Sequence, residues 1–496
     1  MKKILFTALF FLLLICSGAK QVKAEELSPE LVLSNGGSIS DITDSSHYTS
    51  VKFNRNDTIT VTSKDGSLIH GLYISWDSRP VPWILTTDNG EFPCGNNGFI
   101  HEYISLETPA TSLTIQIPQN STLIDGIRIF GEGELPHDVQ VWNPPCERAD
   151  IMAISSHSDD ELLFLGGALT NYSYLYDADV QVVYMCEFWE SNKVREHEKL
   201  DGLWEAGIRF YPTCGNFYDR YCDDVADARQ KYNYENMVSF LVEQIRRFQP
   251  QVLVTHDIYG EYGHGFHILT CQALMNAVEL AADKSEYPDS ESLYGIWNTP
   301  KTYLHIFPAN KIKLDLHIPI EEDYAGRTAL EILKAAYKKH VSQQKWSYHV
   351  SDNYEHSCAD FGLYRTLVGP DTTDDLLCNL KTYAVQEAEA ERLALEEKER
   401  LAALEKAEQE RLAAEEQIRQ ETEQLRENNA ALEKELASLT DAYNKESSAH
   451  TIEKQNLSAQ LNSLHKKNVI LTLGIAVSLL AFAGAIIAVL SMRHKK

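Results

Sequence analysis

The stretch SSHSDDELLFLGG, residues 155–167, decides how the region around it folds. It follows the apolar run ADIMAI and leads into a helix-like run, so the pattern predicts a strand, a tight turn and then a helix. The turn itself crowds a histidine and three acids into five residues: His157, Asp159, Asp160 and Glu161. Neighbouring carboxylates repel one another, so we expect a bound cation to offset their charge.

The same alternation of strands and helices continues on both sides of this stretch. Short apolar strands are predicted at 180–188 and 251–257, and helices at 160–170, 194–208, 236–248 and 267–283. Such alternation is typical of an α/β domain with a largely parallel sheet, whose sites lie beyond the carboxyl ends of the strands. SSHSDDE and THDIYGEYGHGFH (255–267) both begin where a predicted strand ends.

Residues 25–145 show period-two apolar alternation instead, punctuated by Gly, Asn, Asp and Pro, as in SVKFNRNDTITVTSK (50–64) and SLTIQIP (112–118). This pattern predicts an N-terminal β-sandwich, followed by a linker at NPPCE. Its aromatic residues Tyr73, Trp76 and Trp83 either form a platform for sugar rings or pack in the core.

Both ends of the chain carry segments typical of export and anchoring. Residues 1–24 have the basic, apolar and small-residue order of a secretory signal peptide. Residues 469–492 contain no charge and are long enough for a transmembrane helix, followed by the cytoplasmic tail 493–496. These segments predict a single-pass cell-membrane protein whose catalytic domain is extracellular.

Residues 383–467 are dominated by Glu, Ala, Leu, Lys and Arg and predict a helical stalk of roughly 80 residues, on the order of 120 Å long. The seven-residue spacing of Ile418, Leu425, Leu432 and Leu439 favours a coiled coil, and hence a homo-oligomer. A single solvated helix held by Glu–Lys and Glu–Arg pairs is the alternative.

Composition narrows the classes of partner and the redox chemistry. A formal net charge of −27 argues against nucleic acid, because the protein would repel phosphates. Eight of the nine cysteines follow the predicted signal peptide, where disulfides are permitted. Cys214–Cys222 and Cys358–Cys378 are plausible bridges, and free buried thiols are the alternative.

A metal site accounts for the crowded turn. His157 and Asp160 lie three residues apart at a strand-to-helix turn, and His264 and His267 lie three apart at the start of a helix. Two imidazole nitrogens and one carboxylate form a catalytic zinc set that leaves a position for water. Iron or cobalt also suits such ligands.

Three motifs also carry a resemblance. SSHSDDELLFLGGAL resembles the A-H-P-D-D-E-x-x-x-x-G-G motif of the PIG-L/LmbE-like metal-dependent de-N-acetylases, and YGHGFHILT (262–270) resembles their Y-G-H-x-x-H motif. REHEKLDGLWEAGI (195–208) is similar to the family's R-x-x-E helix. The resemblance covers about residues 149–380 and implies a Rossmann-like fold within a domain spanning 149–382. The implied reaction is zinc-dependent removal of an acetyl group from an N-acetylglucosamine-type sugar.

The resemblance also implies a role for each matching residue. His157, Asp160 and His267 would be the metal ligands, and Asp159 the general base. His264 would stabilise the oxyanion or protonate the amine, Tyr262 would hydrogen-bond the carbonyl oxygen, and Arg195 would contact sugar hydroxyls. Glu161 could orient His157. Ser158 and Phe266 depart from the family pattern, but neither is a ligand position.

The expected architecture is therefore multidomain: a signal peptide, a β-sandwich, an α/β Rossmann-like catalytic domain, a helical stalk and a transmembrane helix. The expected activity is deacetylation of an N-acetylated amino sugar or glycan. Two alternatives remain: a catalytically inactive glycan-binding or adhesive surface protein, and a metal hydrolase of another amide or ester.

Overall fold

The structure is a computed structural model that describes residues 22–321, 325–446 and 451–493. It divides into two compact units, Met1–Glu387 and Ala388–Lys496, each of which is described by itself. The predicted signal peptide lies outside the described residues, apart from its last three positions. Side chains are not described at 444–454, at 456 or from 481 onward.

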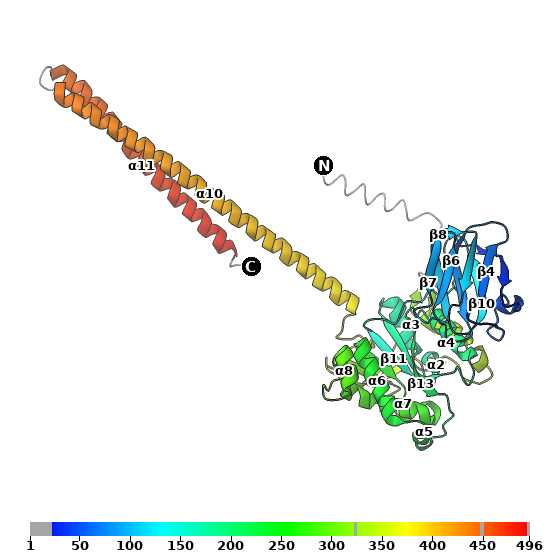
Figure 1. The fold of residues 1–496 in the computed structure, drawn as a ribbon. Helices are drawn as coiled ribbons and strands as arrows, with labels where there is room; N and C mark the ends of the chain where they lie inside the picture. Colours follow the sequence, from blue (N-terminus) through cyan, green and yellow to red (C-terminus); the bar gives the residue numbers. More distant parts are fainter. Residues whose placement is uncertain (1–21, 322–324, 447–450, 494–496) are drawn as a thin grey trace. The chain divides into compact units, whose positions relative to one another are not determined.

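The N-terminal part of the first unit is the predicted β-sandwich (Figure 1). One antiparallel sheet contains β1 (Glu26–Leu27), β3 (Val51–Phe53), β5 (Ile69–Trp76), β8 (His101–Ala110) and β10 (Thr122–Phe130). The other contains β2 (Pro29–Leu33), β4 (Thr58–Ser63), β6 (Trp83–Thr87), β7 (Gly90–Cys94) and β9 (Ser112–Gln116). A short 3-10 helix, η2, covers Ser40–Ile42.

Strands in which buried and exposed residues alternate form the core of this sandwich. Along β4, every second residue is buried, and these side chains share one apolar core with residues of the facing sheet such as Ile74 and Ile127. Trp76 and Trp83 are fully buried in that core, and Tyr73 is only 7% exposed. Of the two interpretations of these aromatics, the structure shows core packing.

The rest of the first unit is the predicted α/β domain. Its seven-stranded sheet has the order β13-β12-β11-β14-β15-β19-β16, and the first five strands are parallel. The strands are β11 (Ile151–Ser155), β12 (Val180–Glu187), β13 (Thr213–Tyr218), β14 (Val252–Thr255), β15 (Lys301–His305), β16 (Lys311–Lys313) and β19 (Asp360–Thr366). In chain order the parallel strands run third, second, first, fourth, fifth, the doubly wound arrangement of a Rossmann-like sheet.

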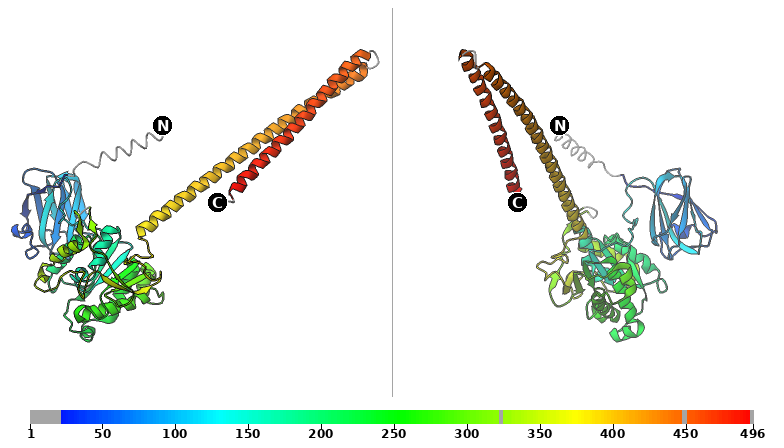
Figure 2. Two further views of the ribbon diagram at one scale, coloured as in Figure 1. Left: turned by 180° about the vertical axis from the view of Figure 1, so that it is seen from behind. Right: turned by 60° about the vertical axis from the view of Figure 1, so that its left-hand side comes forward.

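Helices cover both faces of this sheet (Figures 1 and 2). They are α2 (Asp160–Leu163), α3 (Gly166–Leu175), α4 (Val194–Glu205), α5 (Val225–Lys231), α6 (Tyr234–Phe248), α7 (Gly265–Leu280), α8 (Pro288–Tyr294) and α9 (Ala329–Lys338). Alternate residues of β11 enter two different cores: Ala153 joins that of α3 and α4, and Ile154 joins that of α6 and α7. A strand buried on both faces reads as a continuous apolar run, as ADIMAI does.

One predicted helix is interrupted. Residues 160–170 were expected as a single helix, but α2 ends at Leu163 and α3 begins at Gly166. The amide of Gly167 donates a hydrogen bond to the carbonyl of Cys358, at 3.0 Å. A Cβ on Gly167 would lie 2.6 Å from that oxygen, so this close approach requires glycine.

The second unit is helical, as predicted, but it is not one straight stalk. It contains most of α10 (Tyr383–Glu446) and all of α11 (Thr451–Arg493), which lie side by side in two views (Figures 1 and 2). Residues of both helices, including Ile418, Leu425, Ile470 and Ile475, line one pocket. Exposed ion pairs three or four residues apart, such as Arg411–Glu415, follow α10.

Among the helices as far as the structure describes them, none is long and apolar enough to cross a membrane. The transmembrane segment predicted at 469–492 is therefore not confirmed, and the side chains of its second half lie outside those described. The eight cysteines from Cys94 to Cys378 are all free thiols. Neither Cys214–Cys222 nor Cys358–Cys378 forms a bridge.

Candidate metal and catalytic site

The turns after β11 and β14 bring the predicted metal ligands together. Nδ1 of His157 lies 2.8 Å from Oδ2 of Asp160, and Nε2 of His267 lies 3.0 Å from the same oxygen. The two ring nitrogens are 3.3 Å apart. β11 and β14 are neighbours at the point where the strand order reverses, which is where doubly wound sheets place their sites.

A buried glutamate fixes the orientation of His267. Oε2 of Glu261 accepts hydrogen bonds from Nδ1 of His267 at 2.7 Å and from Nδ1 of His256 at 2.8 Å. Its other oxygen accepts from Nδ1 of His305 at 2.7 Å. One carboxylate therefore holds three imidazoles and leaves Nε2 of His267 pointing toward Asp160. A carboxylate behind a histidine is the usual way to orient a metal ligand.

Hydrogen bonds also hold the other two rings at both nitrogens. Nε2 of His305 lies 3.0 Å from the carbonyl oxygen of Ser357, and its Nδ1 lies 2.7 Å from Glu261. Nε2 of His256 accepts from the amide of Ser156 at 2.9 Å. His256 lies within reach of Asp160 and His267, but both of its nitrogens are engaged and it has none to offer a metal.

Asp159 lies beside the ligands in a strained backbone conformation. Its φ of 117° is in the left-handed region, which a residue with a side chain adopts at an energetic cost. Its amide donates to Glu161 at 2.7 Å, and its Oδ1 accepts from Nη2 of Arg195 at 3.1 Å. Burial raises the pKa of Asp159 to about 7, against the opposing effect of the Arg195 guanidinium. The carboxyl is therefore set to exchange a proton near neutral pH.

Arg195 supports the turn rather than standing free. Nη2 also donates to the carbonyl of Ser158 at 2.5 Å, and the guanidinium lies 3.9 Å over the ring of Phe188. Nη1 reaches Asp219 at 3.4 Å. The side chain is buried, and its contact with sugar hydroxyls stays a prediction.

Two predicted catalytic side chains lie at the rim. The His264 ring centroid is 4.5 Å from that of His267 and 5.1 Å from that of His157. Burial and these two imidazoles lower the pKa of His264 to about 2, so the ring is neutral and has one N–H group available as a donor. Tyr262 is 46% exposed, has a φ of 48° and stacks on Tyr348. A neutral His264 favours oxyanion stabilisation over protonation of the amine.

Glu161 does not orient His157, contrary to expectation. It accepts from the amide of Asp159, and its other oxygen lies 3.4 Å from the buried His340. The outer nitrogen of His157 instead faces Asp219, 3.6 Å away, at the end of β13. Glu161 thus stabilises the catalytic turn, and Asp219 is the carboxylate behind His157.

Residues 152–278 match the family described as "PIG-L: GlcNAc-PI de-N-acetylase". These residues are a PIG-L domain. The ligands His157, Asp160 and His267, with Asp159 and His264, all fall within it. The β-sandwich and the two long helices lie outside the match.

The chain is also similar to named relatives and to a solved structure. The chain is 29% identical over 180 residues to a 1D-myo-inositol 2-acetamido-2-deoxy-alpha-D-glucopyranoside deacetylase of Rhodococcus erythropolis, covering 31% of this chain and 59% of the relative. It is 51% identical over 51 residues to a mycothiol S-conjugate amidase of Streptomyces coelicolor, covering 10% of this chain and 17% of the relative. The chain thus spans less than two thirds of these relatives. N,N'-diacetylchitobiose deacetylase from Pyrococcus horikoshii is 17% identical, with a TM-score of 0.31 over 39% of this chain and 71% of that one.

The donor set of the PIG-L domain fits a transition-metal ion. Ligand atoms about 2.0–2.2 Å from a tetrahedral zinc ion lie roughly 3.3–3.6 Å apart, close to the separations of 2.8 to 3.3 Å found here. Burial lowers the pKa of His267, but Asp160 and Glu261 outweigh it and raise that pKa to about 10. The pocket therefore favours positive charge where the three ligand atoms meet.

Sequence reasoning missed several members of this site: Asp219, His256, Glu261, His305 and His340. His256 and Glu261 stand in the quoted stretch 255–267, but no pattern distinguished them from ordinary turn residues. Asp219 and His305 stand at the ends of β13 and β15, two strands that the sequence analysis did not predict. Their signal was positional, since each stands at the carboxyl end of a parallel strand.

Proposed function

We propose that this protein is a metal-dependent deacetylase that removes the acetyl group from an N-acetylglucosamine-type sugar or glycan. The observation that carries the proposal is the convergence of His157, Asp160 and His267 on one point beside Asp159. Zinc is the metal that best suits two imidazoles and a carboxylate, although another divalent transition metal also suits them. Bound there, it supplies a Lewis acid that polarises the amide carbonyl and acidifies the attacking water.

The residues of the chain then divide the remaining work. Asp159 takes the proton of the attacking water, and its pKa near neutrality allows it to return that proton to the departing amine. His264 and Tyr262 donate hydrogen bonds to the oxygen that becomes negative in the transition state. Arg195 holds Asp159 in its strained conformation by bonding both its carboxylate and the preceding carbonyl.

The proposed substrate class is supported by the comparisons and by the similarity of the catalytic motifs to those of the PIG-L family. The relatives from Rhodococcus and Pyrococcus are named as deacetylases of acetylated amino sugars. We extend that chemistry to this chain and propose a GlcNAc-containing sugar or glycan as its substrate. The similarity to an amidase gives a second candidate, hydrolysis of another amide by the same residues.

We further propose an extracellular location at the cell membrane. The support is in the sequence: the signal-like residues 1–24 and the uncharged residues 469–492. The long helices would separate the catalytic domain from the membrane and offer a surface for self-association. An adhesive protein without activity would not need Asp159, whose removal therefore tests the proposal.

The experiment measures acetate released from chitooligosaccharides and from small GlcNAc glycosides by the zinc-loaded full chain. We expect turnover by the wild type and a loss of about 10²–10⁴-fold in Asp159→Asn, because the base is removed while the ligands stay. Asp88→Asn, an exposed aspartate in the β6–β7 turn, is the matched control and should retain full activity. Equal activity in Asp159→Asn and wild type would contradict the proposal, as would no turnover of any amide by the wild type.

A further inference from the structure

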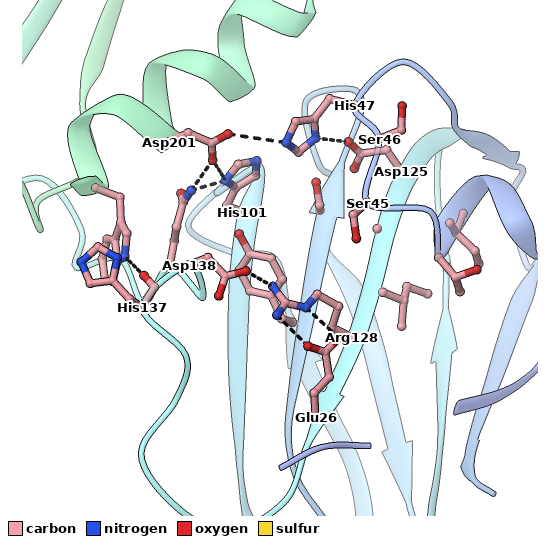
Figure 3. A pocket seen from close by; sticks show the side chains of 18 of the residues that line it. Glu26, Ser45, Ser46, His47, His101, Asp125, Arg128, His137, Asp138 and Asp201 are labelled. Atoms are coloured by element: carbon pink, nitrogen blue, oxygen red, sulfur yellow. Dashed lines mark hydrogen bonds and ion pairs between the residues drawn. The ribbon is translucent and has the colours of Figure 1, made fainter. Parts of the chain in front are cut away.

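A second cluster of histidines lies between the β-sandwich and α4, away from the PIG-L ligands. His47 comes from the loop before β3, His101 begins β8, and His197 lies on α4. One ring nitrogen of each lies within 4.8 Å of the others. His47 and His101 line a cavity of about 420 Å³ together with Asp125 and Asp201, and Figure 3 shows these side chains gathered at one end of it.

A chain of hydrogen bonds fixes the protons of this cluster. Nδ1 of His101 faces Oε1 of Gln140 at 2.7 Å, and because that oxygen only accepts, Nδ1 carries the proton. Nε2 of a neutral His101 then accepts from Nδ1 of His197, at 2.9 Å. Nε2 of His197 is consequently left with a bare lone pair. It has no hydrogen-bond partner in the described chain and is fully buried.

That lone pair faces carboxylates rather than donors. Nε2 of His197 is 3.7 Å from Oδ2 of Asp125 and 3.9 Å from Oδ1 of Asp77, both beyond hydrogen-bond reach. Oδ1 of each aspartate is buried and has no hydrogen-bond partner among the residues described. Both aspartates are 2% exposed, so water does not compensate them from outside. An imidazole nitrogen and two carboxylates, each with an unpaired buried oxygen, thus lie in one place, and this arrangement favours a bound cation.

The charges around the cluster leave the same deficit. Asp77, Asp125 and Asp201 contribute three negative charges, and Lys193, which binds Asp77 from the N-terminal end of α4, contributes one positive charge. His47 donates to Asp125 at 2.6 Å and stacks on His197 with a centroid distance of 4.1 Å. Burial lowers the pKa of His47, but its interactions with Asp125 and Asp201 outweigh burial and raise that pKa to about 10, so His47 contributes a second positive charge. One negative charge therefore remains to be offset, and a bound cation supplies that charge without protonating His197.

We propose that His197, Asp77 and Asp125 bind a second divalent transition-metal ion, held between the β-sandwich and α4 and separate from the catalytic metal. Two ligand atoms about 2.1 Å from one ion lie roughly 3.4–4 Å apart at open bond angles, which matches the 3.7 and 3.9 Å found here. His101 fixes the tautomer of His197, and His47 orients Asp125. Both support ligands from behind, as is usual at metal sites.

The site would act as a structural link. Asp77 follows β5, Asp125 lies on β10 and His197 lies on α4, so the ion would join two sandwich strands to a helix of the PIG-L domain. α4 also carries Arg195, which contacts the catalytic Asp159. An ion that binds only the folded protein stabilises it in proportion to the logarithm of its free concentration.

Counting metal separates this proposal from the proposed catalytic function. The full chain is stripped with a chelator, reloaded with Zn²⁺ and freed of excess ion before elemental analysis. We expect two zinc ions per chain in the wild type, one in His267→Ala, one in His197→Gln and none in the double variant. His317→Gln, a histidine on the surface of the same unit, is the matched control and should retain two.

The outcomes distinguish the two sites. Two zinc ions in His197→Gln, or none in His267→Ala, would overturn the second site while leaving the catalytic proposal intact. One ion in both wild type and His267→Ala, and none in His197→Gln, would support the second site and contradict the catalytic metal. If the second cluster bound only protons, His267→Ala would contain no zinc. One zinc ion in that variant, the expected result, excludes this case.

Two isosteric variants test the same site in case His197→Gln does not fold. Asp77→Asn and Asp125→Asn are each made in the His267→Ala background, and Co²⁺ is titrated while its visible absorption is followed. We expect each amide to weaken Co²⁺ binding at least tenfold with an unchanged circular dichroism spectrum. Unchanged Co²⁺ affinity in both folded variants would overturn the assignment of these ligands.

Discussion

The two histidine clusters of the first unit both surround buried carboxylates with imidazoles. They differ in how far apart their residues lie along the chain. In the PIG-L domain, His157 and Asp160 share one turn, and His264 and His267 share another. In the second cluster, His47, His101 and His197 come from a loop, a strand and a helix spread over about 150 residues. Both bury carboxylates among imidazoles, but only the first leaves a short motif in the sequence. Buried charge thus needs partners in space, whereas detection from sequence needs them close along the chain.

The largest effect should follow from removing the carboxylate that organises the catalytic cluster. Glu261→Gln removes the buried carboxylate that three imidazoles share and frees the ring of His267. Breaking a buried ion pair costs about 3–5 kcal/mol, and losing the carboxylate behind a ligand weakens metal binding about 10–100-fold. Urea unfolding and zinc retention measure the two effects.

Glu286→Gln is the matched control, since Glu286 is exposed and the substitution keeps the backbone carbonyl that accepts from Arg246. It should change neither stability nor zinc content. If Glu261→Gln matched this control in both measurements, Glu261 would have no organising role, and the two clusters would differ more than their geometry indicates.

A smaller effect, confined to activity, is expected at the rim of the catalytic cluster. Tyr262→Phe removes one donor to the developing negative charge, which typically costs about 10²–10³-fold in kcat. Zinc content and unfolding should be unchanged, because the Tyr262 side chain is 46% exposed and is not one of the three predicted ligands. Tyr259→Phe, at a neighbouring position that is 71% exposed, is the control and should turn over like the wild type. A loss of less than fivefold in Tyr262→Phe would remove this residue from the catalytic machinery.

A substitution in the second cluster should have the opposite effect: it should lower the stability of the fold without lowering kcat. Gln140 accepts from His101 and from Trp142 and donates to Asp201 at 2.6 Å. Gln140→Leu leaves these buried groups unpaired, which should cost about 2 kcal/mol in the free energy of unfolding. The kcat of the folded variant should stay within about twofold of the wild type, because Gln140 contacts none of the catalytic residues.

Gln272→Leu, which removes a single exposed bond from Arg229, serves as the control and should cost less than about 0.5 kcal/mol. A large loss of kcat in Gln140→Leu with unchanged stability would show that the two clusters are catalytically coupled rather than independent.

The sequence predicted those features of the fold and site that depend on residues close together along the chain. The continuous apolar run before Ser155 and the alternation in β4 fixed the two sheet types, because burial on two faces or on one leaves different periods. The catalytic turn was visible because its acids are adjacent. The assignment of metal ligands used the same adjacency, and the structure brings all three to one point.

What the sequence could not predict depends on contacts between distant segments. The break before Gly166 depends on the carbonyl of Cys358, almost 200 residues away in the chain. β13 and β15 contain polar residues such as Asn216 and Lys301, which mask their strand character. The second cluster has no motif at all, and no sequence pattern predicted that α11 lies beside α10.

The smallest effect concerns an acid pair that has no such cluster around it. Asp150 and Asp179 lie at the opposite, amino-terminal ends of β11 and β12, where Arg148 is the nearby cation. Burial, followed by the charge of Asp150, raises the pKa of Asp179 from its ordinary 3.8 to about 6. The folded protein therefore holds this proton more tightly than the unfolded chain, so the contribution of Asp179 to stability falls as the pH rises from about 4 to 6. Since the side chain is partly exposed, screening limits the penalty to about 1 kcal/mol above pH 6. Asp179→Asn should thus be more stable than wild type by about that amount at pH 7.5 and equal to it near pH 4, while Asp88→Asn should show no difference at either pH.

Urea unfolding at the two pH values measures the gain, and a variant less stable than wild type at pH 7.5 would mean that the charge of Asp179 is already offset. The comparison would then extend to a third site, because even an acid pair outside both histidine clusters would have acquired a cation.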